Sequence, residues 1–138
     1  MTDAGLVAKK LTLIERYLGE LRSQARPERL FDDVKEERFI VHTLQLAIQA
    51  ALDVASHIVA DDRLGEPVTN HDLFQILARA EWLEADLATS LQRMVGFRNV
   101  IVHDYADVDL GIVRSVVTSH LSDFENFVAA VRARIDGV

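Results

Sequence analysis

The chain has 138 residues, of which 49% are hydrophobic and 27% charged, a composition typical of one compact globular domain rather than a disordered or fibrous chain. It contains no cysteine, which excludes disulfides, thiolate nucleophiles and zinc sites built on sulfur. The net charge of −7 excludes broad phosphate-driven binding, so any nucleic acid must meet a local basic site. We expect a single domain over residues 1–138.

The chain shows no sign of a membrane span or an export signal. No run approaches the roughly 20 consecutive apolar residues that a spanning helix needs. The opening residues, MTDAGLVAKK, lack the charged-then-apolar order of a signal peptide. We therefore expect the protein in the cytoplasm.

The first predicted helix runs from about Asp3 to Ala25. Its apolar residues recur at alternating steps of four and three, which indicates an amphipathic helix packed against another helix. These residues are Val7, Leu11, Ile14, Leu18, Leu21 and Ala25. Pro27 forces Arg26 out of helical geometry, so we expect a break there.

The second predicted helix, from about Asp33 to Ala60, has two contrasting faces. One face is apolar and includes Ile40, Leu44, Ala47, Ile48, Ala51, Ala55, Ile58 and Val59. The other is a narrow polar stripe of Arg38, His42, Gln45, Gln49, Asp53 and Ser56. No charged residue lies between Arg38 and Asp53, although faces that only meet water usually carry charges. Two interpretations stay open: an ordinary solvated face, or a partly covered face lining a cleft or a subunit interface.

Three further helices are predicted. The segment 61–70 is a loop, and Thr69 with Asp72 can cap a short helix over residues 71–80. A fourth helix covers about Glu84 to His103, and a fifth begins near Asp107 or Asp109. This fifth helix presents one apolar face, formed by Val113, Val117, Leu121, Phe124, Val128, Val131 and Ile135. Since no segment shows strand alternation, the predicted fold is all-α, an antiparallel up-and-down bundle of four to five helices.

The segment RNVIVHDY, residues 98–105, concentrates reactive groups at the end of the fourth helix. On a straight helix Arg98 and His103 lie about 140° apart. They can converge if the helix unwinds near His103, or if a twofold axis brings Arg98 of one subunit towards His103 of another. Asn99, one turn before His103, can orient it. Gly96 costs about 1 kcal/mol inside a helix relative to alanine, which fits close approach of a backbone or a phosphate, or a tolerated packing accident.

An arginine and a histidine, without cysteine or a metal cluster, suit cleavage of RNA by its own 2′-hydroxyl. Histidine side chains titrate near neutrality and can move the proton. A guanidinium can hold the phosphate and stabilise the charge that builds on it. Tyr105 can orient the phosphate. Taken alone these residues are weak support, because a lone histidine near a helix end is more often structural.

The run MVGFRNVIVHDY, residues 94–105, resembles the R-x4-H-x-Y motif of HepT-type HEPN ribonucleases, the toxins of prokaryotic toxin–antitoxin pairs. ERFIVHTLQLAIQAALDVASHIVAD resembles the second helix of that family. GEPVTNHDLFQIL resembles the loop and helix that follow it. Together the likeness spans about Glu37 to Leu121.

The resemblance implies a HEPN-like homodimer that cleaves RNA without metal or other cofactor. Arg98 and His103 match the catalytic pair, placed in a cleft at the dimer interface. Tyr105 matches the tyrosine to which a minimal nucleotidyltransferase antitoxin transfers AMP from ATP, adding negative charge beside the site. Two alternatives remain: a non-catalytic helical subunit that binds a nucleotide or supports the nucleotidyltransferase, and a plain helical interaction protein.

The remaining candidates are better explained by structure than by chemistry. Asp53 and His57 lie one turn apart, but two ligands do not make a metal site, and an orienting hydrogen bond or a buried polar pair is the preferred interpretation. His42, His71 and His120 are expected to be structural or solvated. Trp82, the only tryptophan, is expected to anchor a helix junction in the core or an interface.

Overall fold

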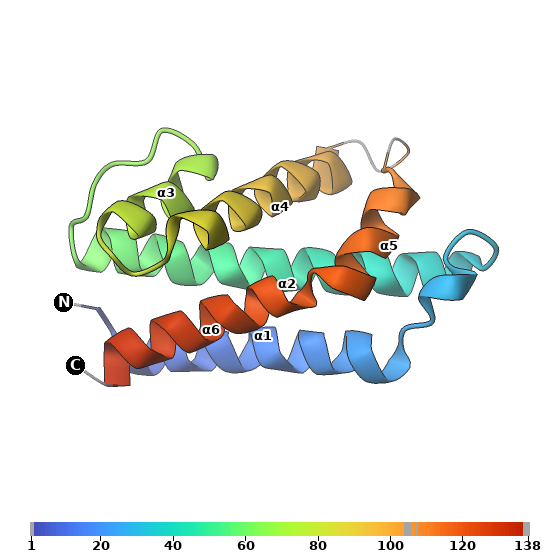
Figure 1. The fold of residues 1–138 in the computed structure, drawn as a ribbon, viewed down its shortest axis with the longest axis horizontal. Coiled ribbons are helices and arrows are strands. Elements are labelled where there is room, and N and C mark those ends of the chain that lie inside the picture. Colours follow the sequence, from blue (N-terminus) through green and yellow to red (C-terminus); the bar gives the residue numbers. More distant parts are fainter. Residues whose placement is uncertain (1, 104–105, 107, 137–138) are drawn as a thin grey trace.

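A computed structural model describes residues 2–103, 106 and 108–136 of the chain (Figure 1). These residues contain six α-helices, a short 3-10 helix and no β-strand, so the all-α prediction is confirmed. In chain order the elements are α1 (Ala4–Gln24), η1 (Pro27–Arg29), α2 (Val34–Asp61), α3 (His71–Arg79), α4 (Ala85–His103), α5 (Leu110–Ser119) and α6 (Leu121–Asp136).

Aspartates cap three of the helices. The carboxylate of Asp3 accepts from the backbone N–H of Leu6 at 3.1 Å, Asp33 accepts from Lys35 at 2.9 Å, and Asp109 accepts from Gly111 at 2.8 Å. Each carboxylate satisfies an amide that has no partner inside its helix.

The predicted cap of α3 is only half correct. Asn70 holds the N-cap position and its side chain makes no capping bond. The carboxylate of Asp72 does accept from the N–H groups of Val68 and Thr69, at 2.8 and 3.3 Å. The reciprocal bond of a capping box, in which the Thr69 hydroxyl would accept from a backbone N–H, is not found among the described residues.

The prediction of one long fifth helix is wrong. The helix is interrupted at His120. The N–H of His120 donates to the carbonyl of Val116 at 2.9 Å and ends α5, and the carbonyl of His120 accepts from the N–H of Asp123 at 3.1 Å as α6 begins. The break lets α5 lie across the end of the bundle while α6 runs along α1 (Figure 1). Apolar periodicity does not reveal this break, because the same face continues from Val117 to Leu121 on either side of it.

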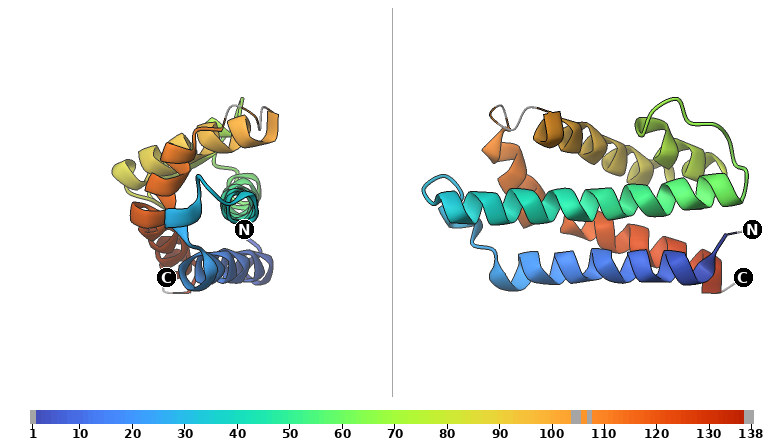
Figure 2. Two further views of the ribbon diagram at one scale, coloured as in Figure 1. Left: turned by 90° about the vertical axis from the view of Figure 1, so that its right-hand side faces the viewer. Right: turned by 180° about the vertical axis from the view of Figure 1, so that it is seen from behind.

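The long helices α1, α2, α4 and α6 alternate in direction, as an up-and-down bundle requires (Figures 1 and 2). Both termini lie at one end of the bundle. The connection between α1 and α2, the C-terminal end of α4 and the start of α5 lie at the other end (Figure 1). Residues far apart in sequence are thus brought to the end that carries His103.

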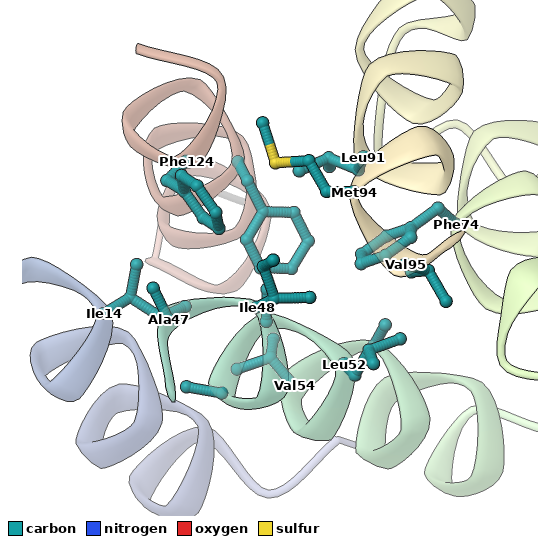
Figure 3. Close-up of a cluster of buried hydrophobic side chains, with 14 of the residues drawn as sticks. Ile14, Ala47, Ile48, Leu52, Val54, Phe74, Leu91, Met94, Val95 and Phe124 are labelled. Atoms are coloured by element: carbon teal, nitrogen blue, oxygen red, sulfur yellow. The ribbon is translucent and has the colours of Figure 1, made fainter. Parts of the chain in front are cut away.

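The core lies between these helices and α3. Side chains of α1, α2, α3, α4 and α6 point towards one another, among them Ile14, Ile48, Phe74, Met94 and Phe124 (Figure 3). The apolar faces predicted for the first, second and last helices are buried, apart from partly exposed Ala25 and Ile135. α2 is long and apolar enough to cross a membrane by length and composition alone, but 61% of its most apolar window is buried in the bundle, as in a core helix.

Trp82 lies at the junction between α3 and α4, as predicted. Its side chain is buried, and the guanidinium carbon of Arg134 lies 5.0 Å from the ring centroid. The ring is therefore an anchor for this end of the bundle.

Candidate functional site

Arg98 lies on the side of α4 that faces α2, and its side chain is half-buried. Its Nη2 donates to the side-chain oxygen Oε1 of Gln49 on α2, and its Nη1 donates to Oδ1 of Asn99 at 3.3 Å. Both acceptors are neutral amides. Among the described residues, no carboxylate contacts Arg98 directly to neutralise its charge.

Gln49 is held in turn by a chain of polar contacts. Its amide nitrogen Nε2 donates to Oδ1 of Asp53 at 2.9 Å, and Nζ of Lys10 on α1 lies 3.4 Å from Oδ2 of the same carboxylate. A carboxylate accepts only, so it selects the amide orientation in which the oxygen of Gln49 points to Arg98. Three helices thus contribute to the placement of one guanidinium.

The Nε atom of Arg98 is buried and has no hydrogen-bond partner in the described residues. Buried N–H groups are almost always paired, and leaving one unpaired costs about 1–3 kcal/mol. An unsatisfied donor on a cation without a carboxylate partner is typical of a site that receives an anion.

His103 is the last residue of α4 and is exposed to solvent. The helix continues without unwinding to this residue, so Arg98 and His103 of one chain stay about 140° apart around its axis. Of the two ways in which they could meet, unwinding before His103 is therefore not observed. Asn99, expected to orient His103, contacts Arg98 instead in the described part of the chain.

The stripe on α2 is neither fully solvated nor fully covered. Gln45, Gln49 and Asp53 in its centre are partly buried, while Arg38 and His42 towards the N-terminal end are exposed. The covered part is the part beside Arg98. The N-terminal stretch of the stripe is thus solvated and the stretch beside Arg98 is partly covered, while its place in a cleft or a subunit interface stays a prediction.

Other predicted site residues have separate outcomes. The expected Asp53–His57 hydrogen bond is not found among the described residues, because the Asp53 carboxylate faces Gln49 and Lys10. In the same part of the chain no three histidine, aspartate or glutamate side chains gather as metal ligands.

Gly96 lies within α4 and is partly exposed. Tyr105 lies outside the described residues, so its role stays a prediction.

Gln49 and Lys10, two residues of the chain of polar contacts that ends at Arg98, were not predicted as site residues from the sequence. Gln49 was visible as a member of the uncharged stripe, and the absence of charges around it was the signal that something covers it. Lys10 gave no such signal, since a lysine on an amphipathic helix is an ordinary surface residue. Only the packing of α1 against α2 brings it to Asp53.

Comparison with known proteins identifies the family of the chain. A family model described as "Ribonuclease HepT-like" matches residues 9–131. The chain belongs to the HepT-like ribonuclease family. The resemblance found in the sequence is therefore confirmed.

Curated relatives of this HepT-like chain are nucleases by name. It is 33% identical over 129 residues to the mRNA nuclease HepT of Shewanella oneidensis, covering 93% of this chain and 97% of the relative. It is 27% identical over 130 residues to the tRNA nuclease HepT of Aphanizomenon flos-aquae, covering 93% and 88% respectively.

The fold of the HepT-like chain also matches a solved complex. The tri-AMPylated Shewanella oneidensis HEPN toxin in complex with MNT antitoxin superposes with a TM-score of 0.87 at 32% identity. The match covers 96% of this chain and 99% of the toxin. The HEPN-like fold prediction is thereby confirmed.

Proposed function

We propose that this protein is the toxin of a toxin–antitoxin pair and acts as a metal-independent endoribonuclease in the cytoplasm. The observation that carries the proposal is the state of Arg98, a half-buried guanidinium with neutral amide partners and an unpaired Nε. Membership of the HepT-like family and the placement of Arg98 within the motif support it further.

The reaction is a transesterification within the RNA. The 2′ oxygen attacks the adjacent phosphorus, the bond from phosphorus to the 5′ oxygen breaks, and His103 moves the proton from the 2′-hydroxyl towards the leaving oxygen. The products carry a 2′,3′-cyclic phosphate and a 5′-hydroxyl. Arg98 binds the phosphate oxygens, on which negative charge grows in the transition state.

The site forms between two copies of the chain. Because α4 is helical up to His103, a twofold axis is the arrangement that brings Arg98 of one subunit to His103 of the other. Two apolar residues on this stretch of α4, Val100 and Val102, are 41% and 43% exposed. They provide apolar surface for the second copy to cover.

The residues around Arg98 act by positioning it. Gln49 and Asn99 hold the two terminal nitrogens, and Asp53 holds Gln49. Gly96 lies two turns before His103 on the same face of α4, where its lack of a side chain would leave room for the RNA backbone beside that histidine. These roles predict losses of rate rather than of RNA affinity.

The antitoxin is a minimal nucleotidyltransferase, and it neutralises the toxin by transferring AMP from ATP to Tyr105. Each AMP adds negative charge and bulk beside a site that must accept a phosphate. After incubation with the partner and ATP, intact-mass spectrometry should show added AMP on the unmodified chain. A Tyr105→Phe protein that still gains the same mass would exclude Tyr105 as the sole acceptor.

Cleavage of RNA by the purified protein tests the proposal. We expect cleavage that persists in EDTA and is lost in Arg98→Ala and His103→Ala proteins, both checked for retained helicity. Arg93→Ala, which removes an exposed arginine of the same helix, is the matched control and should cleave normally. Absence of cleavage together with saturable ATP or AMP binding would instead indicate a non-catalytic accessory subunit.

A further inference from the structure

We propose that Phe31 and Arg114 form a stacking platform for a base of the RNA, separate from the residues that carry the cleavage chemistry. This inference rests on the proposed ribonuclease function and adds a substrate subsite to it. The two residues come from different parts of the chain, since Phe31 follows η1 and Arg114 belongs to α5. The guanidinium carbon of Arg114 lies 4.6 Å from the centroid of the Phe31 ring.

The ring of Phe31 is open to solvent. It is 53% exposed, whereas the neighbouring Leu30 is 1% exposed and anchors the turn in the core. The guanidinium covers part of the ring, and the 53% exposure of Phe31 leaves the rest of its surface for a base to contact. A phenylalanine so exposed beside a residue that already anchors the turn contributes little to folding.

The guanidinium of Arg114 makes no ion pair with the described carboxylates, whereas Arg22 and Arg132 pair with Glu125 and Glu15. A guanidinium stacked on a ring keeps its in-plane N–H donors free. Arg114 can therefore bind a phosphate while Phe31 receives a base. A single-stranded nucleotide presents both groups.

The pair lies at the end of the bundle that carries the reaction. The turn after η1 and the start of α5 are at the same end as the C-terminus of α4 (Figure 1; Figure 2, right). The exposed stripe residues Arg38 and His42 lead along α2 from Gln49 towards this turn. From Gln49 to the first residue of α2 is about 22 Å along the helix, a distance that a short stretch of extended RNA can follow.

An exposed ring beside an exposed guanidinium suits RNA, since a nucleotide presents both a base and a phosphate. The chain as a whole carries −7, so RNA can be held only where unpaired cations gather. Arg114 and Arg38 supply exposed cations at this end of the bundle, beside the exposed carboxylate of Asp32. Val34 and Ile112 also expose apolar surface here, so contact between copies of the chain is the alternative that the sedimentation measurement below distinguishes.

RNA binding by His103→Ala protein, which should bind without cleaving, tests the platform. The probe is a fluorescein-labelled, unstructured oligoribonucleotide, followed by anisotropy. In this background we expect Phe31→Leu to raise Kd about tenfold, because leucine keeps apolar bulk but removes the stacking surface. Phe31→Trp should bind at least as tightly as the parent. Arg114→Gln should reduce the slope of log K against log salt by about 0.7, the value for one contact to a single strand.

Arg134→Gln is the matched control, because Arg134 also stacks on an aromatic ring, that of Trp82, but at the opposite end of the bundle. It should leave affinity and salt slope unchanged. Parental affinity in Phe31→Leu would overturn the platform, and a changed mass in sedimentation would then assign Phe31 to contact between copies. If wild-type protein cleaves no RNA and the His103→Ala protein binds none, the proposed function fails and the platform with it.

Discussion

Replacing Gln49 by leucine removes the acceptor that holds Nη2 of Arg98 while keeping most of the side-chain volume. A hydrogen bond to a charged group contributes about 1.5–3 kcal/mol when it is sheltered from water. Arg98 is half-buried, so solvent replaces part of the loss, and we expect the free energy of unfolding to fall by about 1–2 kcal/mol. Arg98 then has an unpaired Nη2 beside its already unpaired Nε.

The same change should slow RNA cleavage, because a displaced guanidinium no longer meets the phosphate as its charge grows. A loss of about 1.4 kcal/mol in the transition state corresponds to a tenfold lower single-turnover rate. Asp53→Ala should also slow cleavage, but add little in the Gln49→Leu background, since both act through one contact.

Gln92→Leu is the matched control for this experiment. Gln92 also lies on α4 and also makes a half-buried bond to another helix, accepting from Nε2 of Gln75 at 2.8 Å. Both partners are neutral, so urea unfolding should show a loss of about 1 kcal/mol with an unchanged cleavage rate. A Gln49→Leu protein that cleaves as fast as Gln92→Leu would refute the positioning of Arg98 by Gln49.

Two further predictions concern stability. Phe127 is fully buried and meets Phe74 edge to face at 5.7 Å, so Phe127→Ala should lower the free energy of unfolding by about 3–5 kcal/mol; a loss below 1 kcal/mol in urea would contradict this packing. The hydrogen bond from Arg132 lowers the pKa of Glu15. The pair therefore stabilises the fold at pH values above the ordinary pKa of a carboxyl group, and this stabilisation is lost as the pH falls through the lowered pKa of Glu15. Both side chains are well exposed, so Glu15→Gln should cost under about 1 kcal/mol at neutral pH, and this cost should shrink as the pH falls through the lowered pKa of Glu15. A cost that stays the same in acid would argue against the ion pair.

Much of the fold could be predicted from apolar periodicity. The faces of α1 and α2 were predicted nearly residue by residue, because burial of a helix face leaves a regular trace in the sequence. The break at His120 left none, since α5 and α6 bury the same continuing face. The change of direction between α5 and α6 depends on how they pack against η1 and α1. A local sequence pattern does not contain this tertiary information.

The sequence predicted Arg98 and His103 as site residues, but not the contacts that hold Arg98 in place. Arg98 was predicted as a site residue and Gln49 only as part of the polar stripe, because their pairing depends on the register between α2 and α4. Asn99 was expected to serve His103 because the two are one turn apart, but the long side chain of Arg98 reaches Asn99 first. The ion pair between Lys10 and Asp53 likewise depends on a third helix.

Mixing two inactive proteins tests most directly whether Arg98 and His103 form one site across a homodimer. After Arg98→Ala and His103→Ala subunits are unfolded together and refolded, mixed dimers contain one site with both residues intact and one with neither. Random mixing should therefore restore about a quarter of the wild-type rate of RNA cleavage, while each variant refolded alone stays inactive. Mixed dimers that form but remain inactive would contradict a site shared between subunits, and full cleavage by either variant alone would contradict the catalytic pair itself.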